Sequence, residues 1–187
     1  MRTLSVFNNV SLDGYFTDAH GDMSWARKED PEWQAFVAEN ASGGGMLVLG
    51  RATYEMMAGF WPTPAASEAM PIVAEKMNKM PKIVFSKTLG RASWENTEVV
   101  SGDIVASVRK LKESQGPNMV IMGSGTIVSQ LTQARLIDKY QFVVSPVVLG
   151  SGRTMFDGVG DKLNLRLQKS RAFANGTVVL WYQPTES

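Results

Sequence analysis

Short runs of consecutive hydrophobic residues alternate along the chain with segments whose hydrophobic residues recur at helical spacing. Met46–Leu49 and Met119–Met122, the latter within an expected strand at Asn118–Met122, are runs of the first kind, typical of strands buried on both faces of a parallel sheet. Asp103–Ser114 is of the second kind, because its aliphatic residues fall on one face of a helix. The alternation predicts a mixed α/β fold with a mostly parallel sheet and helices on both faces.

The same two patterns place the remaining elements. Further strands are expected at Arg2–Asn9, Lys82–Ser86, Thr97–Val100 and Tyr140–Val148. Further helices are expected from Pro31, after Asp30 as N-cap, and at Ala52–Ala58 and Thr126–Ala134. Gly59–Pro71 contains three prolines and is expected to be a loop.

An Asn-Gly pair predicts a hairpin in the last part of the chain. Asn175-Gly176 separates the β-prone runs Leu163–Ala174 and Thr177–Gln183, which is a strong hairpin signal. We therefore predict a three-layer α-β-α architecture, in which a mostly parallel mixed sheet ends in a C-terminal antiparallel hairpin. The length of 187 residues predicts one domain over 1–187.

Composition narrows the classes of function. The net charge is +1, which argues against a general nucleic-acid binder. The absence of cysteine excludes disulfides, thiolate catalysis and cysteine metal sites, and one histidine cannot build a histidine metal cluster. No metal is expected. No stretch has the length of a membrane span and no signal peptide is visible, so a cytoplasmic protein is expected.

Two glycine turns are the strongest functional signal, because each follows an apolar strand and opens a helix. The first is Gly50-Arg51-Ala52-Thr53 and the second is Gly123-Ser124-Gly125-Thr126. Glycine permits close approach of the backbone to a ligand, and a helix N-terminus attracts anions. Arg51 and Thr53 add a cation and a hydroxyl. Two such turns predict a nucleotide cofactor, with NADPH as the leading hypothesis.

Other polar residues lie near predicted strand ends. Ser86 and Lys87 follow a strand and are candidates for the 2′-phosphate that distinguishes NADP from NAD, or form a solvated turn. Asp13 precedes Gly14 and either orients a substrate, helps deliver a proton, or belongs to an Asp-Gly turn. Trp25 either stacks on a flat ring or packs in the core.

Two alternative functions belong to other classes. A protein of the same fold can bind a nucleotide or another small ligand without catalysis. The glycine-flanked Ser124 also raises the possibility of a hydrolase, although the single histidine, His20, falls in a polar loop and is poorly placed to activate it.

Together, these segments resemble the dihydrofolate reductase-like superfamily, and more narrowly the reductase domain of bacterial riboflavin biosynthesis and its stand-alone relatives. The segments that resemble it, in chain order, are Ser11–Gly14, Gly21–Trp25, Gly50–Glu55, Gly123–Thr126, Leu136–Asp138 and Ser145–Gly152.

The resemblance implies an NADPH-dependent reductase of a pteridine- or pyrimidine-like heterocycle, acting as a homodimer. The cofactor would contact Gly50, Arg51, Thr53, Ser86, Lys87, Gly123, Ser124, Gly125 and Thr126. Asp13 would be catalytic, and Trp25 and Phe156 would lie toward the substrate. Riboflavin-type reductases carry further basic residues for a ribose phosphate, which have no clear counterpart after Arg51, so the substrate stays open.

Overall fold

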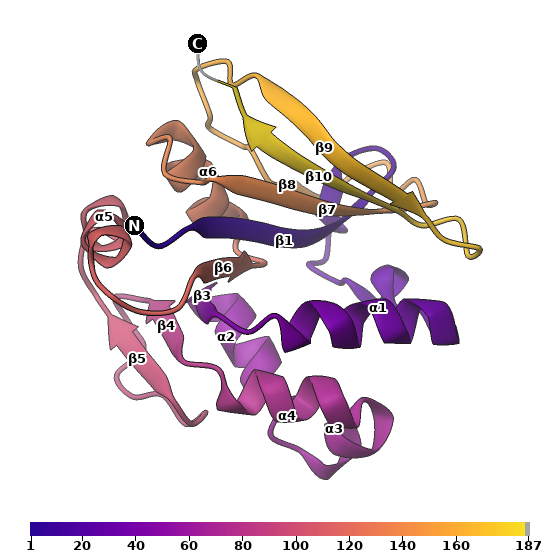
Figure 1. The fold of residues 1–187 in the computed structure, drawn as a ribbon, viewed down its shortest axis with the longest axis horizontal. Helices are drawn as coiled ribbons and strands as arrows, with labels where there is room; N and C mark the ends of the chain where they lie inside the picture. The colour runs from indigo at the N-terminus through magenta and orange to yellow at the C-terminus, as the bar shows by residue number, and fades with distance from the viewer. Residues whose placement is uncertain (186–187) are drawn as a thin grey trace.

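A mostly parallel sheet forms the centre of the structure, a computed structural model that describes residues 1–185 (Figure 1). Within this range the main sheet has eight strands: β1 (Leu4–Ser11), β3 (Met46–Gly50), β4 (Lys82–Phe85), β5 (Thr97–Val100), β6 (Met119–Met122), β7 (Lys139–Ser145), β9 (Leu165–Ala172) and β10 (Val178–Pro184). A separate pair joins β2 (Tyr15–Thr17) to β8 (Arg153–Thr154). The predicted strands and the hairpin are confirmed.

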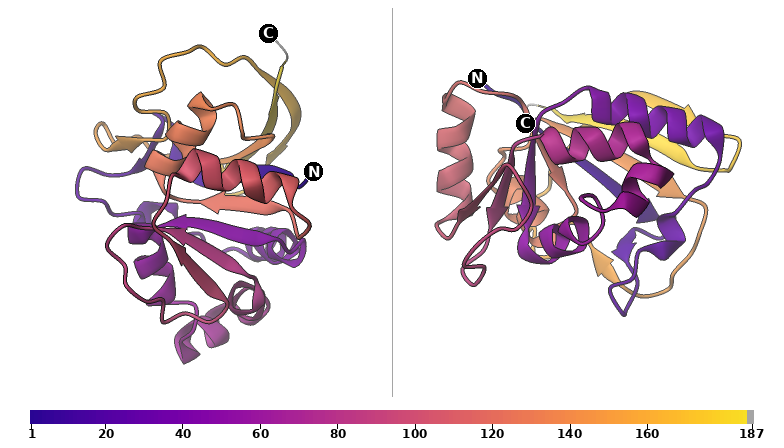
Figure 2. Two further views of the ribbon diagram at one scale, coloured as in Figure 1. Left: turned by 90° about the vertical axis from the view of Figure 1, so that its left-hand side faces the viewer. Right: turned by 90° about the horizontal axis from the view of Figure 1, so that it is seen from below.

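The described helices are α1 (Pro31–Ser42), α2 (Arg51–Ala58), α3 (Pro64–Ala69), α4 (Pro71–Lys79), α5 (Ile104–Glu113), α6 (Gly125–Gln133) and the 3₁₀ turn η1 (Ser24–Ala26). They cover both faces of the sheet. Val48 packs with α5 and α6, whereas its neighbours Leu47 and Leu49 pack with α2 and α4. Figure 2, right, shows α1 and α4 side by side. The predicted three layers are confirmed.

Strand order decides which segments meet at each rim. The sheet runs β5-β4-β3-β6-β1-β7-β10-β9, parallel from β5 to β7 and antiparallel from β7 to β9. Gly50 pairs with Phe85, and Ser11 pairs with Ser145. Because parallel strands end at one rim, the turns that follow β1, β3, β4, β6 and β7 lie along the same edge.

The expected loop at Gly59–Pro71 was wrong, because it contains helix α3 and leads directly into α4. The Thr63 hydroxyl accepts the backbone N–H of Ala66 at 3.3 Å, and Pro64 occupies the first helical turn. Pro71 occupies the first turn of α4. Proline is favoured at that position, so these prolines begin helices instead of excluding them.

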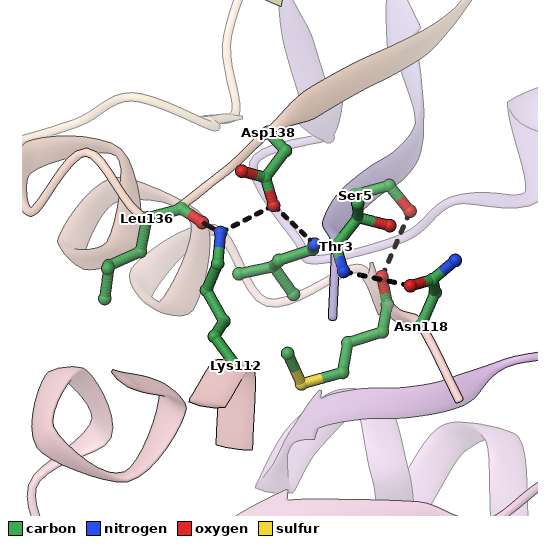
Figure 3. A network of polar contacts seen from close by, with 8 residues as sticks. Thr3, Ser5, Lys112, Asn118, Leu136 and Asp138 are labelled. Carbon is green, nitrogen blue, oxygen red and sulfur yellow. Dashed lines mark hydrogen bonds and ion pairs between the residues drawn. The ribbon is translucent and has the colours of Figure 1, made fainter. Parts of the chain in front are cut away.

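A polar network closes the opposite, amino-terminal rim (Figure 3). The Lys112 ammonium donates to Asp138 at 2.5 Å, and the same carboxylate accepts the backbone N–H of Leu4 at 2.7 Å. The Asn118 side chain accepts the backbone N–H of Thr3 at 2.9 Å. These polar groups of the amino-terminal rim are therefore hydrogen-bonded within the protein.

Candidate functional site

The two glycine turns touch each other at the carboxyl-terminal rim. Gly50 ends β3 and Gly123 follows β6, which is the neighbouring strand. The Ser124 hydroxyl accepts the backbone N–H of Gly50 at 2.7 Å and lies 3.0 Å from the hydroxyl of Thr53. The structure thus brings together these four predicted residues from two turns separated by more than seventy positions.

Close packing between the turns explains why Gly50 and Gly123 are glycines. A Cβ atom at Gly50 would lie 2.7 Å from the Ser124 hydroxyl, and one at Gly123 would lie 2.6 Å from the Thr53 hydroxyl. Gly123 also has a φ of 64°. The expectation that these glycines make room for a ligand is corrected, since protein side chains occupy that space. The backbone amides, not the missing side chains, are what the turns offer to a ligand.

The helices that begin at the two turns have no side-chain cap. Asp30 and Asp103 cap α1 and α5, but no side chain within residues 1–185 caps α2 or α6, and α4 lacks one as well. Ser124 is the N-cap of α6 in a left-handed conformation, followed by Gly125 and the exposed Thr126. The first amides of a helix have no partner within it, so two neighbouring N-termini here can bind an anion.

Asn8 is a site residue that sequence reasoning missed. Its side chain is 3% exposed, and its oxygen accepts the backbone N–H of Gly123 at 2.7 Å, while its nitrogen donates to the sulfur of Met155 at 3.2 Å. Asn8 therefore fixes the second glycine turn from β1. The available signal was a polar Asn8-Asn9 pair inside a predicted strand, but its partner depends on the pairing of β1 with β6.

The turn after β4 approaches the first glycine turn through Arg51. The Arg51 guanidinium donates to the Thr88 hydroxyl at 2.6 Å and pairs with Glu55 at 2.8 Å. The Ser86 hydroxyl accepts the backbone N–H groups of Thr88 and Leu89, which makes a tight turn of Ser86–Thr88. The predicted groups at β3 and β4 thus lie on one continuous edge.

A pocket of about 440 Å³ opens at the ends of β4 and β5. Its lining includes Phe85 at the end of β4, Ser86 and Lys87 after it, Val100 at the end of β5, and Gln130 of α6. Lys87 is exposed and has no ion-pair partner within the described part of the chain. A free cation beside a partly apolar pocket suits a ring that bears an anionic group.

Asp13 lies on the same rim and binds the loop that follows β7. Its carboxylate accepts the backbone N–H of Gly150 at 2.7 Å and that of Leu149 at 3.1 Å. The hydroxyl of Ser11 and these amides lower the pKa of Asp13 to about 2. An ionised carboxylate suits the orientation of a substrate or loop better than proton donation. Its catalytic role stays a prediction.

The two aromatic residues assigned to the substrate lie in different surroundings. Trp25, in η1, donates its indole N–H to the backbone oxygen of Asp22 at 3.1 Å. Phe156 is 40% exposed and packs on β7, with its ring centre 5.9 Å from that of Phe142 and 6.1 Å from that of Tyr140. No aromatic contact joins Trp25 to Phe156 in residues 1–185. Their substrate roles stay predictions.

Residues 1–185 contain neither a metal-binding cluster nor a membrane-spanning helix. No group of three or more histidine, aspartate or glutamate side chains is close enough together there to hold a metal ion. No helix in the same range is long and apolar enough to cross a membrane.

The strand order, the three layers and the shared carboxyl-terminal rim define a dihydrofolate reductase-like α/β protein. The sequence profile of the RibD C-terminal domain matches residues 2–179, so the chain belongs to that family. The resemblance inferred from the sequence is confirmed.

Relatives of known sequence cover most of the chain. It is 23% identical over 175 residues to the uncharacterized protein YyaP of Bacillus subtilis (strain 168), covering 92% of this chain and 90% of YyaP. It is 26% identical over 173 residues to the uncharacterized protein YwjB of the same organism, covering 92% of each.

Solved structures share the fold. A protein of Shewanella sp. PV-4 provisionally assigned to riboflavin biosynthesis has a TM-score of 0.74 at 22% identity, over 98% of this chain and 99% of its own. A pyrimidine reductase-like protein of Corynebacterium diphtheriae has a TM-score of 0.66 at 11% identity, over 100% and 93%. A third solved structure is the diaminohydroxyphosphoribosylaminopyrimidine deaminase/5-amino-6-(5-phosphoribosylamino)uracil reductase of Thermotoga maritima. It has a TM-score of 0.69 at 16% identity, and the match covers 98% of this chain and 57% of that protein.

Proposed function

We propose that the protein is an NADPH-dependent reductase of a pteridine- or pyrimidine-like heterocycle. The observation that supports this most strongly is the contact of the two uncapped glycine turns through Ser124, on the same rim as the pocket beside Lys87. The fold is shared with a protein named as a 5-amino-6-(5-phosphoribosylamino)uracil reductase, which supports the same class of reaction.

The residues at the rim fit the chemical parts of NADPH. The amides at the starts of α2 and α6 would hold the pyrophosphate, together with the hydroxyls of Thr53 and Thr126. The pocket after β4 would hold the adenosine, with Ser86 and Lys87 at its 2′-phosphate. Ser124 would act from behind the turns, since its hydroxyl is already bonded to Gly50.

When bound, NADPH supplies the hydride for reduction of the substrate. The chain's own residues would position the rings, exclude water and manage the proton. Asp13 holds the loop after β7 at the end of β1, and Trp25 lies on the segment that follows β2. Asp13 thus lies at the ends of β1 and β7, which follow β6 in the sheet order, past the proposed cofactor groups of β4, β3 and β6.

Steady-state oxidation of NADPH tests the proposal with pterins, flavins and pyrimidines as acceptors. We expect turnover with at least one flat heterocycle, and none with NADPH alone. NADPH binding without turnover of any acceptor would instead support the non-catalytic alternative on the same fold. Labelling of Ser124 by a fluorophosphonate would contradict both; we expect none, because the Ser124 hydroxyl accepts the Gly50 N–H and no hydrogen bond joins it to His20 within residues 1–185.

The proposal includes a homodimer. On the face of the sheet that holds Tyr140 and Phe142, the hydrophobic residues Phe156 and Leu167 are 40% and 49% exposed. Leu167 lies on β9, the last strand of the described sheet. A second copy of the chain that covers this face would bury them, and sedimentation tests that arrangement.

A further inference from the structure

Lys28 is a partly buried lysine at the rim that none of the roles above uses. Its ammonium donates to the Ser145 hydroxyl at 3.1 Å and to the backbone oxygen of Ala26 at 2.8 Å, and lies 4.8 Å from the ring centre of Trp33. Ser145 is the last residue of β7 and is 2% exposed. The hydrogen bond to Ser145 therefore holds the long, flexible side chain of Lys28 at the end of β7.

The position of Lys28 places it beyond the proposed cofactor groups. Ser145 at the end of β7 pairs with Ser11 at the end of β1. Asp13 lies two residues after Ser11. Lys87 follows β4. Between β4 and β7 lie the strands β3, β6 and β1, so the ends of β4 and β7 are ~19 Å apart at normal strand spacing. The amine thus lies at the part of the rim where a substrate, not the adenosine, would sit.

The surroundings favour release of a proton near neutral pH. Burial lowers the pKa of Lys28 to about 8, and the nearby Asp30 carboxylate opposes that effect. The other groups that face the ammonium are the Ser145 hydroxyl from β7, the Ala26 carbonyl from η1 and the Trp33 ring from α1. An acid is most effective when its pKa is near the working pH. Asp13, with a pKa of about 2, is ionised there.

We propose that Lys28, held by Ser145, donates the proton in the reduction and recognises a carbonyl or imine edge of the heterocycle. This inference rests on the reductase function proposed above. In a two-electron reduction of a C=N or C=O bond, the carbon receives a hydride from NADPH, which becomes NADP⁺. The nitrogen or oxygen receives a proton from the Lys28 ammonium. The neutral amine that remains regains a proton from water, so charge and atoms balance.

A direct titration tests the amine without any cofactor. Lysine side chains are labelled with ¹³C and ¹⁵N, and the Lys28 signal is assigned by its loss in Lys28→Arg. We expect Lys28 to titrate near pH 8 in the native protein and nearer its ordinary value, ~10.4, after urea unfolding. Titration of Lys28 at its ordinary value in the folded protein would overturn the proposal.

Kinetics test the proton transfer. Lys28→Arg keeps the positive charge but cannot donate near neutral pH, so kcat should fall by ~100-fold or more. We expect kcat of the native protein to fall above pH 8 and this fall to be absent in Lys28→Arg. Added methylamine should partly restore the activity of Lys28→Ala. The acceptors are 7,8-dihydrofolate and 5-amino-6-(5-phosphoribosylamino)uracil. Lys79→Arg is the control, because Lys79 lies on α4 and pairs with Glu75 at the surface.

Calorimetry with NADPH separates the two proposals. We expect Lys28→Arg to bind NADPH within twofold of the native protein. NADPH binding with kcat within threefold of native in Lys28→Arg would overturn the role of Lys28 and leave the reductase function intact. Absence of NADPH binding, or of turnover with any of the pterins, flavins and pyrimidines in the native protein, would overturn the reductase function and the step that depends on it.

Discussion

At the scale of single residues, the candidate site depends on two polar side chains that bind backbone amides. Ser124 accepts the N–H of Gly50, and Asn8 accepts the N–H of Gly123. The types of residue at the turns were evident from the sequence. These two bonds were not, because each joins strands whose order in the sheet no local pattern specifies.

Asn8→Leu should destabilise the protein. It keeps the approximate size of the side chain but leaves the partly buried N–H of Gly123 without its acceptor, which costs about 1–3 kcal/mol of unfolding free energy. Urea denaturation measures the loss. Asn9→Leu is the control, because the Asn9 side-chain oxygen is buried and has no hydrogen-bond partner within residues 1–185. Equal losses in the two variants would contradict the role of Asn8.

At the scale of elements, most boundaries followed from the sequence. Thr97–Val100 forms a strand with the predicted bounds, and Asp103 caps α5 through the N–H of Ala106. Helices α3 and α4 were missed because three prolines were taken as helix breakers. Helix α4 is stabilised by burial of Val73 and Met77 against strands that are distant in the sequence, which local patterns do not reveal.

The packing of the two glycine turns predicts coupling between Gly50 and Ser124. Gly50→Ala alone should lose about 1–3 kcal/mol, because its Cβ would lie 2.7 Å from the Ser124 hydroxyl. Ser124→Gly removes that hydroxyl and suits the left-handed backbone at this position, where φ is 59°. The double variant should therefore lose less stability than the sum of the single variants. A double-mutant cycle in urea checks this, and strict additivity would count against close packing of the turns.

Lys82, the first residue of β4, predicts a pH dependence of stability. Lys82 is 1% exposed, donates to the backbone oxygens of Asn78, Met80 and Glu95, and lies 4.2 Å from the Trp94 ring centre. Burial lowers its pKa from 10.5 to about 8. Between these values the unfolded chain binds more protons at this residue than the folded protein, so the Lys82 contribution to stability increases as pH rises.

Lys82→Met removes this titration. The unfolding free energy of the native protein should rise more steeply between pH 8 and 10 than that of the variant. Lys28 and other groups titrate in both proteins, so only the difference between the two curves is assigned to Lys82. Parallel curves for the two proteins over that range would show that Lys82 keeps its ordinary pKa.

At the scale of the whole molecule, the family and the shared rim were predictable, because strand–helix alternation implies parallel strands whose ends meet. The single domain over 1–187 and the roles of the named site residues stay predictions. The contents of the rim were harder to foresee. The pocket after β4 requires α5 and α6 to flank it, and the Lys28–Ser145 contact joins segments more than a hundred residues apart.

The proposed homodimer should separate when charge is placed on the exposed sheet face. Leu167→Glu should convert a species of twice the chain mass into monomers in sedimentation velocity, because a buried unpaired carboxylate is strongly unfavourable. Ile72→Glu is the control, since Ile72 is 53% exposed on α4, which packs on the other face. The proposed interface would be contradicted if the native protein sediments as a monomer, or if the Leu167→Glu variant remains a dimer.

The carboxyl-terminal rim is proposed to bind NADPH across its two glycine turns and the Lys87 pocket. Calorimetric titration of the native protein with NADPH and with NADH tests it most directly. We expect NADPH to bind more tightly, and the gap in affinity to shrink in Lys87→Ala but not in Lys79→Ala, because only Lys87 lines the pocket. Equal affinities for the two nucleotides, or no binding of either, would contradict the claim.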